Sequence, residues 1–264
     1  MLRSLVGKSL HDQWRPLLVW TVLSAMLAGF YLSLYPSIGA VDEMRQLLES
    51  MPPALRAMFA AETVDISTPA GYLNVELFTF VVPLLVFAVT LVSGGATAAE
   101  EERGTLELLL ANPLPRWRIV LERWIAMIGA AGILCLGIWI GLAATAWIAS
   151  IDIALDLVGA ALVSAWLLGV ATGSLALALG TVTGNRMLSI GVALGVAVIA
   201  FFVNALAPLA DALEPWRVLS LQYHYIGYDP LATGLDLVHA SVLAAIAVVL
   251  LAVAMVAFER RDIH

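Results

Sequence analysis

Charged residues are scarce in this sequence, and so is cysteine. Only 12% of the 264 residues are Asp, Glu, Lys or Arg, whereas 62% are hydrophobic. Soluble domains carry about 25% charged residues, so the composition excludes an ordinary soluble domain and predicts an integral membrane protein. Cys135, the single cysteine, lies inside an apolar run. It has no partner for an intrachain disulfide, and we expect it to pack as a small apolar group.

Groups that could catalyse a reaction or bind a metal are also lacking. The four histidines show no metal-ligand spacing, and no nucleophile–base pair is visible. Gly7-Lys8-Ser9 has the end of a phosphate-binding loop, but the full pattern requires glycine where Leu2 stands. The sequence therefore predicts a protein that is not an enzyme, with no catalytic residue and no metal or cofactor of its own.

Six apolar stretches are each long enough to cross a membrane, which takes about 20 residues. We predict spans at residues 17–38, 74–98, 119–149, 157–182, 187–207 and 237–258. The predicted fold is an all-α membrane protein, with residues 1–264 forming one transmembrane domain. Pro83 is expected to kink the second span. Residues 183–186 are expected to form a tight turn between the fourth and fifth spans.

Three further segments are expected to lie at the membrane surface. Residues 1–16 mix apolar and charged positions and predict an interfacial amphipathic helix that ends at Pro16. A signal peptide is the alternative, but the following apolar run is too long for one. Residues 39–73 predict a polar loop with a surface helix. Residues 208–236 are apolar and aromatic but broken by prolines, which predicts short helices that dip into the outer leaflet.

Polar side chains inside the predicted spans are mild ones, such as Ser164 and Thr172, and ionisable groups are almost absent. Hydrogen bonds between helices are the simpler interpretation, and a weakly polar substrate pathway is the alternative. Gly-x-x-x-Gly pairs at 169/173, 180/184 and 191/195 allow helices to approach closely.

The basic residues indicate how the chain is oriented. With six spans, ten of the thirteen lysines and arginines share a side with both termini, and only Arg45, Arg56 and Arg217 lie on the other. Because cytoplasmic loops carry the excess of Lys and Arg, we predict that both termini are cytoplasmic.

The stretch 100–123, EEERGTLELLLANPLPRWRIVLER, is the only long charged run between two apolar spans. Gly104-Thr105 predicts a break followed by a helix N-cap. Leu106 and Leu109 then fall on one face of a short helix, which ends at Asn112-Pro113. A basic and aromatic membrane-interface anchor follows at 116–118. A merely solvated charged face is the alternative.

This stretch resembles the cytoplasmic motif of ABC transporter permeases of the type-2 (ABC-2) export class. In that family acidic residues precede Gly-Thr-Leu, a short apolar helix, and a proline before a basic residue. These match Glu100–Leu110, Pro113 and Arg116. The resemblance extends to the N-terminal helix, the six spans and the proline-broken external segment. There Leu219-Ser220 with Tyr225 resembles the family's L-S-P…Y pattern, although Leu221 stands where proline is usual.

The resemblance implies the permease subunit of an ATP-driven exporter in the plasma (inner) membrane. It implies a separate ABC ATPase subunit, which would bind ATP and Mg²⁺, and a second permease subunit, as a homodimer. Segment 100–118 would be the cytoplasmic coupling segment. The residues implied in coupling to the ATPase are Glu101, Glu102, Gly104, Thr105, Leu106 and Leu109. Membrane lipid would surround the chain and nucleic acid would have no part; lipid, drug, peptide and ion substrates all stay open.

Two other classes of membrane protein compete with this interpretation. A secondary-active transporter without an ATPase partner should show charges at mid-membrane or symmetry between its halves, and neither is found. A membrane-embedded enzyme should show His, Asp or Glu clustered at one depth, and none is found.

Overall fold

The computed structural model describes residues 5–37, 50–52, 68–102, 104, 115–210 and 212–261, with side chains from Trp14 onward. Within these residues every regular element is helical, which confirms the predicted all-α class. Five helices are long and apolar enough to cross a membrane, and a bent pair adds a sixth span if it is counted as one.

The long helices overlap the predicted spans, although the second predicted span, 74–98, is divided among several helices. They are α1 (Leu5–Leu34), α5 (Val81–Gly94), α8 (Arg116–Ala149), α9 (Leu155–Thr183), α10 (Arg186–Leu206) and α14 (Leu237–Arg260). The short elements are η1 (Tyr35–Ser37), α4 (Pro69–Leu73), η2 (Asn74–Phe78), α6 (Ala96–Glu102), η3 (Ala207–Leu209), α11 (Glu214–Arg217), α12 (Leu221–Ile226) and α13 (Pro230–Thr233).

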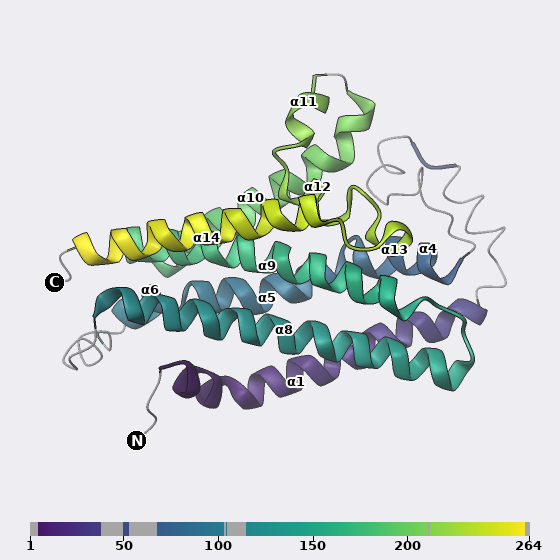
Figure 1. Cartoon of the computed structure of the whole chain (residues 1–264), viewed down its shortest axis with the longest axis horizontal. Helices are drawn as coiled ribbons and strands as arrows, with labels where there is room; N and C mark the ends of the chain where they lie inside the picture. The colour runs from purple at the N-terminus through teal and green to yellow at the C-terminus, as the bar shows by residue number, and fades with distance from the viewer. Residues whose placement is uncertain are drawn as a thin grey trace.

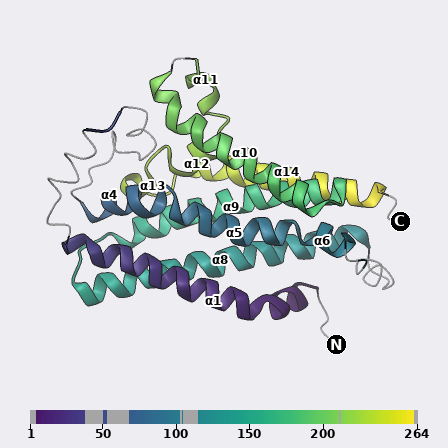
Figure 2. The same cartoon turned by 180° about the vertical axis from the view of Figure 1, so that it is seen from behind.

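The long helices form one bundle around α9, which packs against α5, α8, α10 and α14 (Figures 1 and 2). Helix α1 lies along α8 on the outside of the bundle. The start of α1, the end of α6 and the end of α14 lie together at one end, and the short helices α4, α12 and α13 lie at the other. We call the first the charged end, because Glu100–Glu102 of α6 lie there.

Helix α1 continues through Pro16 without a break, so residues 5–16 of the expected interfacial segment and the first span belong to one helix. A proline removes one helical hydrogen bond, but in a bilayer a helix is the only single segment that satisfies the rest of its backbone. The span ends at Leu34, short of the expected residue 38.

The second span is bent by 42° between η2 and α5. The break lies just before Pro83, as a proline kink should, because the ring clashes with the carbonyl four residues earlier, at Thr79. On the other side of the bend, the N–H of Thr79 donates to the carbonyl of Asn74, five residues back and not the usual four, at 2.9 Å. This bond makes η2 a π-helical turn.

Small residues let the buried helices approach closely. A Cβ added to Gly173 of α9 would lie 2.5 Å from Met127 Sδ and 2.8 Å from Thr90 Cβ. A Cβ on Gly191 or Gly195 of α10 would meet nothing within 4 Å. The 169/173 pair therefore marks a real helix contact, whereas the 191/195 pair faces open space.

Several of the mild polar groups form hydrogen bonds within or between helices, whereas buried Thr97 Oγ1 has no partner among the described residues. Thr172 Oγ1 donates to the carbonyl of Leu168 in its own helix, at 3.0 Å. Ser174 Oγ accepts from Trp124 Nε1 across the α8–α9 contact at 2.8 Å, and Ser164 Oγ shares a 2.6 Å hydrogen bond with Tyr228 Oη. Cys135 is buried with its thiol free, as expected.

Candidate functional site at the charged end

Glu100, Glu101 and Glu102, which open the stretch 100–123, form the last turn of α6. Gly104 follows in the left-handed region, with φ of +68°, and its N–H donates to the carbonyl of Glu101 at 2.9 Å. Glycine adopts this conformation without strain, so the predicted break is present at Gly104. Thr105, Leu106 and Leu109 lie outside the described residues, together with the rest of 105–114.

Glu100 reaches from α6 to α8. Its carboxylate accepts from Arg123 Nη2, whose side chain is only 9% exposed. A buried arginine needs a paired carboxylate, since an unpaired charge in an apolar setting is costly. This contact fixes α6 against α8.

Glu101 reaches the residue that follows α14. Arg261 donates to both of its oxygens, from Nη2 at 2.6 Å and from Nη1 at 3.0 Å, and Nη1 also reaches the carbonyl of Thr181 at 3.3 Å. Gly184, with φ of +66°, makes room for this pair: a Cβ there would lie 2.3 Å from Arg261 Nη2. The predicted turn 183–186 is thus present, and Glu101 and Arg261 pack against it.

Glu102 reaches the start of α10. Its Oε1 accepts from the backbone N–H of Arg186 at 2.8 Å, while Asn185 caps the same helix by accepting from Leu188 N. Carboxylates are favourable at a helix N-terminus, where free N–H groups and the helix dipole meet them. Arg116 Nη1 completes the set by donating to the carbonyl of Arg261 at 2.7 Å.

We call Glu100, Glu101 and Glu102 with these partners the α6 anchor. Three successive carboxylates bind three different elements: α8, the residue after α14, and the start of α10. From the sequence we expected Glu101 or Glu102 to pair with basic residues of a partner protein. In the structure both carboxylates have partners within the chain.

The α6 anchor positions helices relative to one another. Its acidic groups are held by arginines or a backbone N–H, and the described residues contain no group of three or more His, Cys, Asp and Glu that could hold a metal. Sequence reasoning missed Arg123 and Arg261 as partners of the glutamates. The available signal was Arg123 itself, a cation four residues into the predicted span 119–149.

The opposite end of the bundle holds the short helices. Three of them, α11, α12 and α13, lie within the expected broken segment 208–236, whose position in the outer leaflet stays a prediction. Tyr225 of α12 is fully buried and donates its hydroxyl to the carbonyl of Phe78, at the bend of the second span, at 2.8 Å. Burial raises the pKa of Tyr225 well above 10, so the hydroxyl stays a donor. Ser220 caps α12 by accepting from Gln222 N and Tyr223 N.

Two titratable contacts hold these short helices. Asp229 accepts from Asn74 Nδ2 at 2.8 Å, and burial raises its pKa while this hydrogen bond opposes the shift. His224 Nε2 lies 2.8 Å from the carbonyl of Val218, and its Nδ1 lies 2.9 Å from Nδ1 of His239. Because a carbonyl oxygen can only accept, Nε2 of His224 is the protonated nitrogen and donates to Val218. In neutral His224, Nδ1 is then the acceptor for the N–H at Nδ1 of His239.

Comparison with known proteins adds one finding. The family model described as "ABC-2 family transporter protein" matches residues 3–263, nearly the whole chain. No curated protein matches the chain.

Proposed function

Because this chain belongs to the ABC-2 family of transporter proteins, we propose that it is the permease subunit of an ATP-driven exporter. The chain is a multi-pass membrane protein and a transport component that is not itself catalytic. Its family implies an ABC ATPase partner. ATP and Mg²⁺ bind in that separate subunit, and two copies of the permease flank the pathway as a homodimer.

The α6 anchor carries the proposal for coupling. Residues 103–114 connect α6 to α8, and the ends of both helices are fixed there by Glu100–Arg123 and Arg116. A displacement of this connection moves α6, and through Glu101 and Glu102 it reaches the end of α14 and the start of α10. ATP-driven movement of the connection thus tilts several spans together between two states.

Two groups of residues divide the coupling role. Thr105 caps a short helix whose leucines, Leu106 and Leu109, bury in a groove of the ATPase. Glu101, Glu102 and Gly104 fix the base of that helix on the permease. Burying a leucine contributes roughly 1.5–3 kcal/mol, so the leucines carry most of the contact with the partner.

The charged end faces the cytoplasm in this proposal, and the chain lies in the plasma (inner) membrane. Eight of the described basic residues lie in or directly after elements that reach this end, namely Lys8, Arg15, Arg116, Arg118, Arg123, Arg186, Arg260 and Arg261. Arg217, in α11, is the described basic residue at the other end. The excess of arginine favours a cytoplasmic position for the charged end.

A secondary-active transporter without an ATPase is the alternative function. Such a carrier needs ionisable groups at mid-membrane. Among the described residues, Arg123 and Glu122 lie two turns from the start of α8, and Glu76 lies in the first half of the bent second span. This distribution favours the ABC exporter.

The test is assembly with the ATPase. The tagged chain is purified from its own host in mild detergent, and the co-purified ATPase subunit and its ATP turnover are measured. Leu109→Asp should abolish co-purification and transport while the permease still inserts. Leu219→Ser, an exposed leucine at the opposite end, is the control and should leave both unchanged. Full ATPase activity and transport in the Leu106→Ser, Leu109→Ser double variant would contradict the coupling proposal.

A further inference from the structure

Two histidines face each other between α12 and α14, at the end of the bundle that holds the short helices. Their Nδ1 atoms lie 2.9 Å apart, and Nε2 of His224 donates to the carbonyl of Val218 at 2.8 Å. The side chain of His224 is buried. We call His224 and His239 the histidine pair. One hydrogen bond joins the two rings, so only one of the facing Nδ1 atoms can carry a proton.

The surroundings of His239 accommodate one added proton. The ring of Tyr228 stacks on His239, with centroids 4.6 Å apart and planes 8° apart. A cation over an aromatic face is attracted to it. Asp236, three residues earlier, accepts from the backbone N–H of His239 at 3.3 Å. A proton added to His239 leaves its Nδ1 N–H in place, so a singly protonated histidine pair keeps the hydrogen bond between its rings.

A second proton cannot be accommodated in the same contact. It would go to Nδ1 of His224 and face the N–H of His239, so two donors and two positive charges would meet. The guanidinium carbon of Arg217 lies 5.0 Å from the centre of the Tyr223 ring, which packs edge-on against both histidines. Burial lowers the pKa of His224, the bond to Val218 opposes this shift, and His239 lowers the pKa further.

The helices that pack against α12 supply no carboxylate to the histidine pair. These helices are α9, α10 and α14, and their charged residues are Asp156, Arg186, Glu259 and Arg260. Arg186, Glu259 and Arg260 lie at the charged end, and Asp156 lies in the first turn of α9. Asp229 is bonded to Asn74. None of the ion pairs among the described residues includes a histidine.

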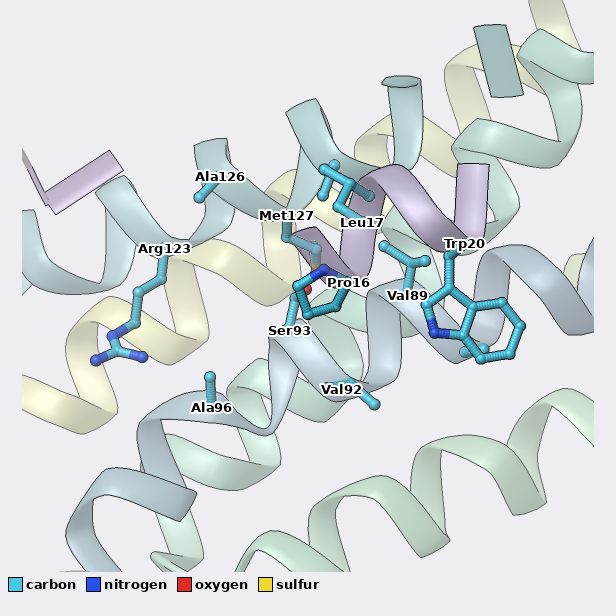
Figure 3. Close-up of a pocket in the computed structure, with 12 residues that line it drawn as sticks. Pro16, Leu17, Trp20, Val89, Val92, Ser93, Ala96, Arg123, Ala126 and Met127 are labelled. Atoms are coloured by element: carbon cyan, nitrogen blue, oxygen red, sulfur yellow. The ribbon is translucent and has the colours of Figure 1, made fainter. Parts of the chain in front are cut away.

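A buried cation at the other end of the bundle shows the difference. Arg123 lines a groove of about 280 Å³ between α1, α5 and α8 (Figure 3). Its side chain is 9% exposed and pairs with Glu100. A buried charge without such a partner is costly. The doubly protonated histidine pair would hold two charges with no carboxylate in ion-pair contact, so the two rings should separate.

We propose that the histidine pair is a pH-sensitive contact, in which the second proton separates α12 from α14 and loosens this end of the bundle. Helix α12 keeps its other attachments. Tyr225 donates to the carbonyl of Phe78, and Ser220 Oγ donates to the carbonyl of Ala200 at 2.6 Å. The gap therefore opens towards α14. If the charged end is cytoplasmic, the histidine pair responds to the pH outside the cell; the contact itself does not depend on that orientation.

Distances between spin labels test this separation in the purified full-length chain. Cys135→Ala removes the native thiol. Labels at Leu219→Cys, just before α12, and at Ser241→Cys in α14 occupy exposed positions. Their distance should lengthen between pH 7.5 and pH 5. Labels at Leu219→Cys and Leu84→Cys, an exposed position in the second span, form the matched control and should keep their distance.

Two substitutions separate the effect of the proton from the effect of the contact. Asparagine places its amide where Nδ1 of histidine stands, so His239→Asn can donate to His224 or accept from it. This variant should keep the short distance at both pH values. Glutamine reproduces the Nε2 donor, so His224→Gln keeps the bond to Val218 but loses the bond to His239. It should show the long distance at both pH values. His11→Gln, in α1 at the charged end, should behave like the native chain.

Two results would overturn the proposal. The first is a Leu219–Ser241 distance that stays unchanged in the native chain down to pH 5. The second is a lengthening at pH 5 that persists in His239→Asn, because another group would then drive it. A lengthening that persists in His239→Asn but is lost in Asp229→Asn would assign the change to the contact between Asp229 and Asn74.

Discussion

The Glu101–Arg261 pair should contribute far more to stability than an ordinary surface ion pair. Its two hydrogen bonds are 2.6 and 3.0 Å long, and the side chains are only 18% and 25% exposed. Exposed pairs contribute about 0–1 kcal/mol, whereas breaking a buried pair costs about 3–5 kcal/mol. An intermediate burial with bidentate geometry predicts a coupling energy of about 2 kcal/mol.

A double-mutant cycle measures this coupling energy. Glu101→Gln, Arg261→Gln and the double variant are unfolded in detergent by a denaturant titration, and the free energies of unfolding are compared. Because both Arg261 variants lose the hydrogen bond from Arg261 to the carbonyl of Thr181, the cycle cancels the contribution of that bond. The control cycle uses Arg118 and Glu122, a pair one helical turn apart joined by one 2.7 Å contact, in which Arg118 is 44% exposed and Glu122 is 10% exposed. It should give about 0.3–0.5 kcal/mol.

The difference between the two coupling energies tests whether burial and bidentate geometry strengthen the Glu101–Arg261 pair. A Glu101–Arg261 coupling energy no larger than that of the control would refute the reasoning, because burial and bidentate geometry would then have added nothing. Sodium chloride should weaken the control pair more than the Glu101–Arg261 pair, since the guanidinium of Arg118 is more exposed than that of Arg261 and is screened more strongly.

Three other predictions follow from contacts described above. Gly173→Ala should destabilise the protein by about 1–3 kcal/mol, because its Cβ would crowd Met127, whereas Gly191→Ala, with open space around it, should be neutral or slightly stabilising; denaturant unfolding of both variants distinguishes them. Burial lowers the pKa of His224, with the bond to Val218 opposing the shift and His239 adding to it, so the folded state takes up fewer protons than the unfolded chain. Stability should therefore fall as pH drops below about 6.5, and thermal melts at pH 7.5 and 5.5 should show less change in His224→Gln. The orientation of the chain can be tested with an impermeant thiol reagent in intact cells, which should label Trp216→Cys but not Thr183→Cys. The native Cys135 is buried and gives little background. Labelling at position 183 would contradict the proposed topology.

The spans could be predicted from the sequence because hydropathy over about 20 residues is a local property. Local turn chemistry was also readable: Gly184 and Asn185 end one helix and begin the next where expected. The partners of the glutamates could not be predicted in this way. Glu101 pairs with Arg261, 160 positions away, and only the folded bundle brings the two residues together. The predicted coupling helix stays a prediction, since Thr105, Leu106 and Leu109 lie outside the described residues.

The long separation between Glu101 and Arg261 also sets an order of events during biosynthesis. Glu101 leaves the ribosome 160 residues before its partner, which at about 5–20 residues per second is a delay of roughly 10–30 s. During that interval the polar contacts of the α6 anchor come from Arg123 and, later, from the start of α10. The last contact of the α6 anchor closes only after α14 has been inserted. A nascent chain that stalls before the sixth span therefore lacks the Arg261 partner of Glu101 and leaves the α6 anchor incomplete.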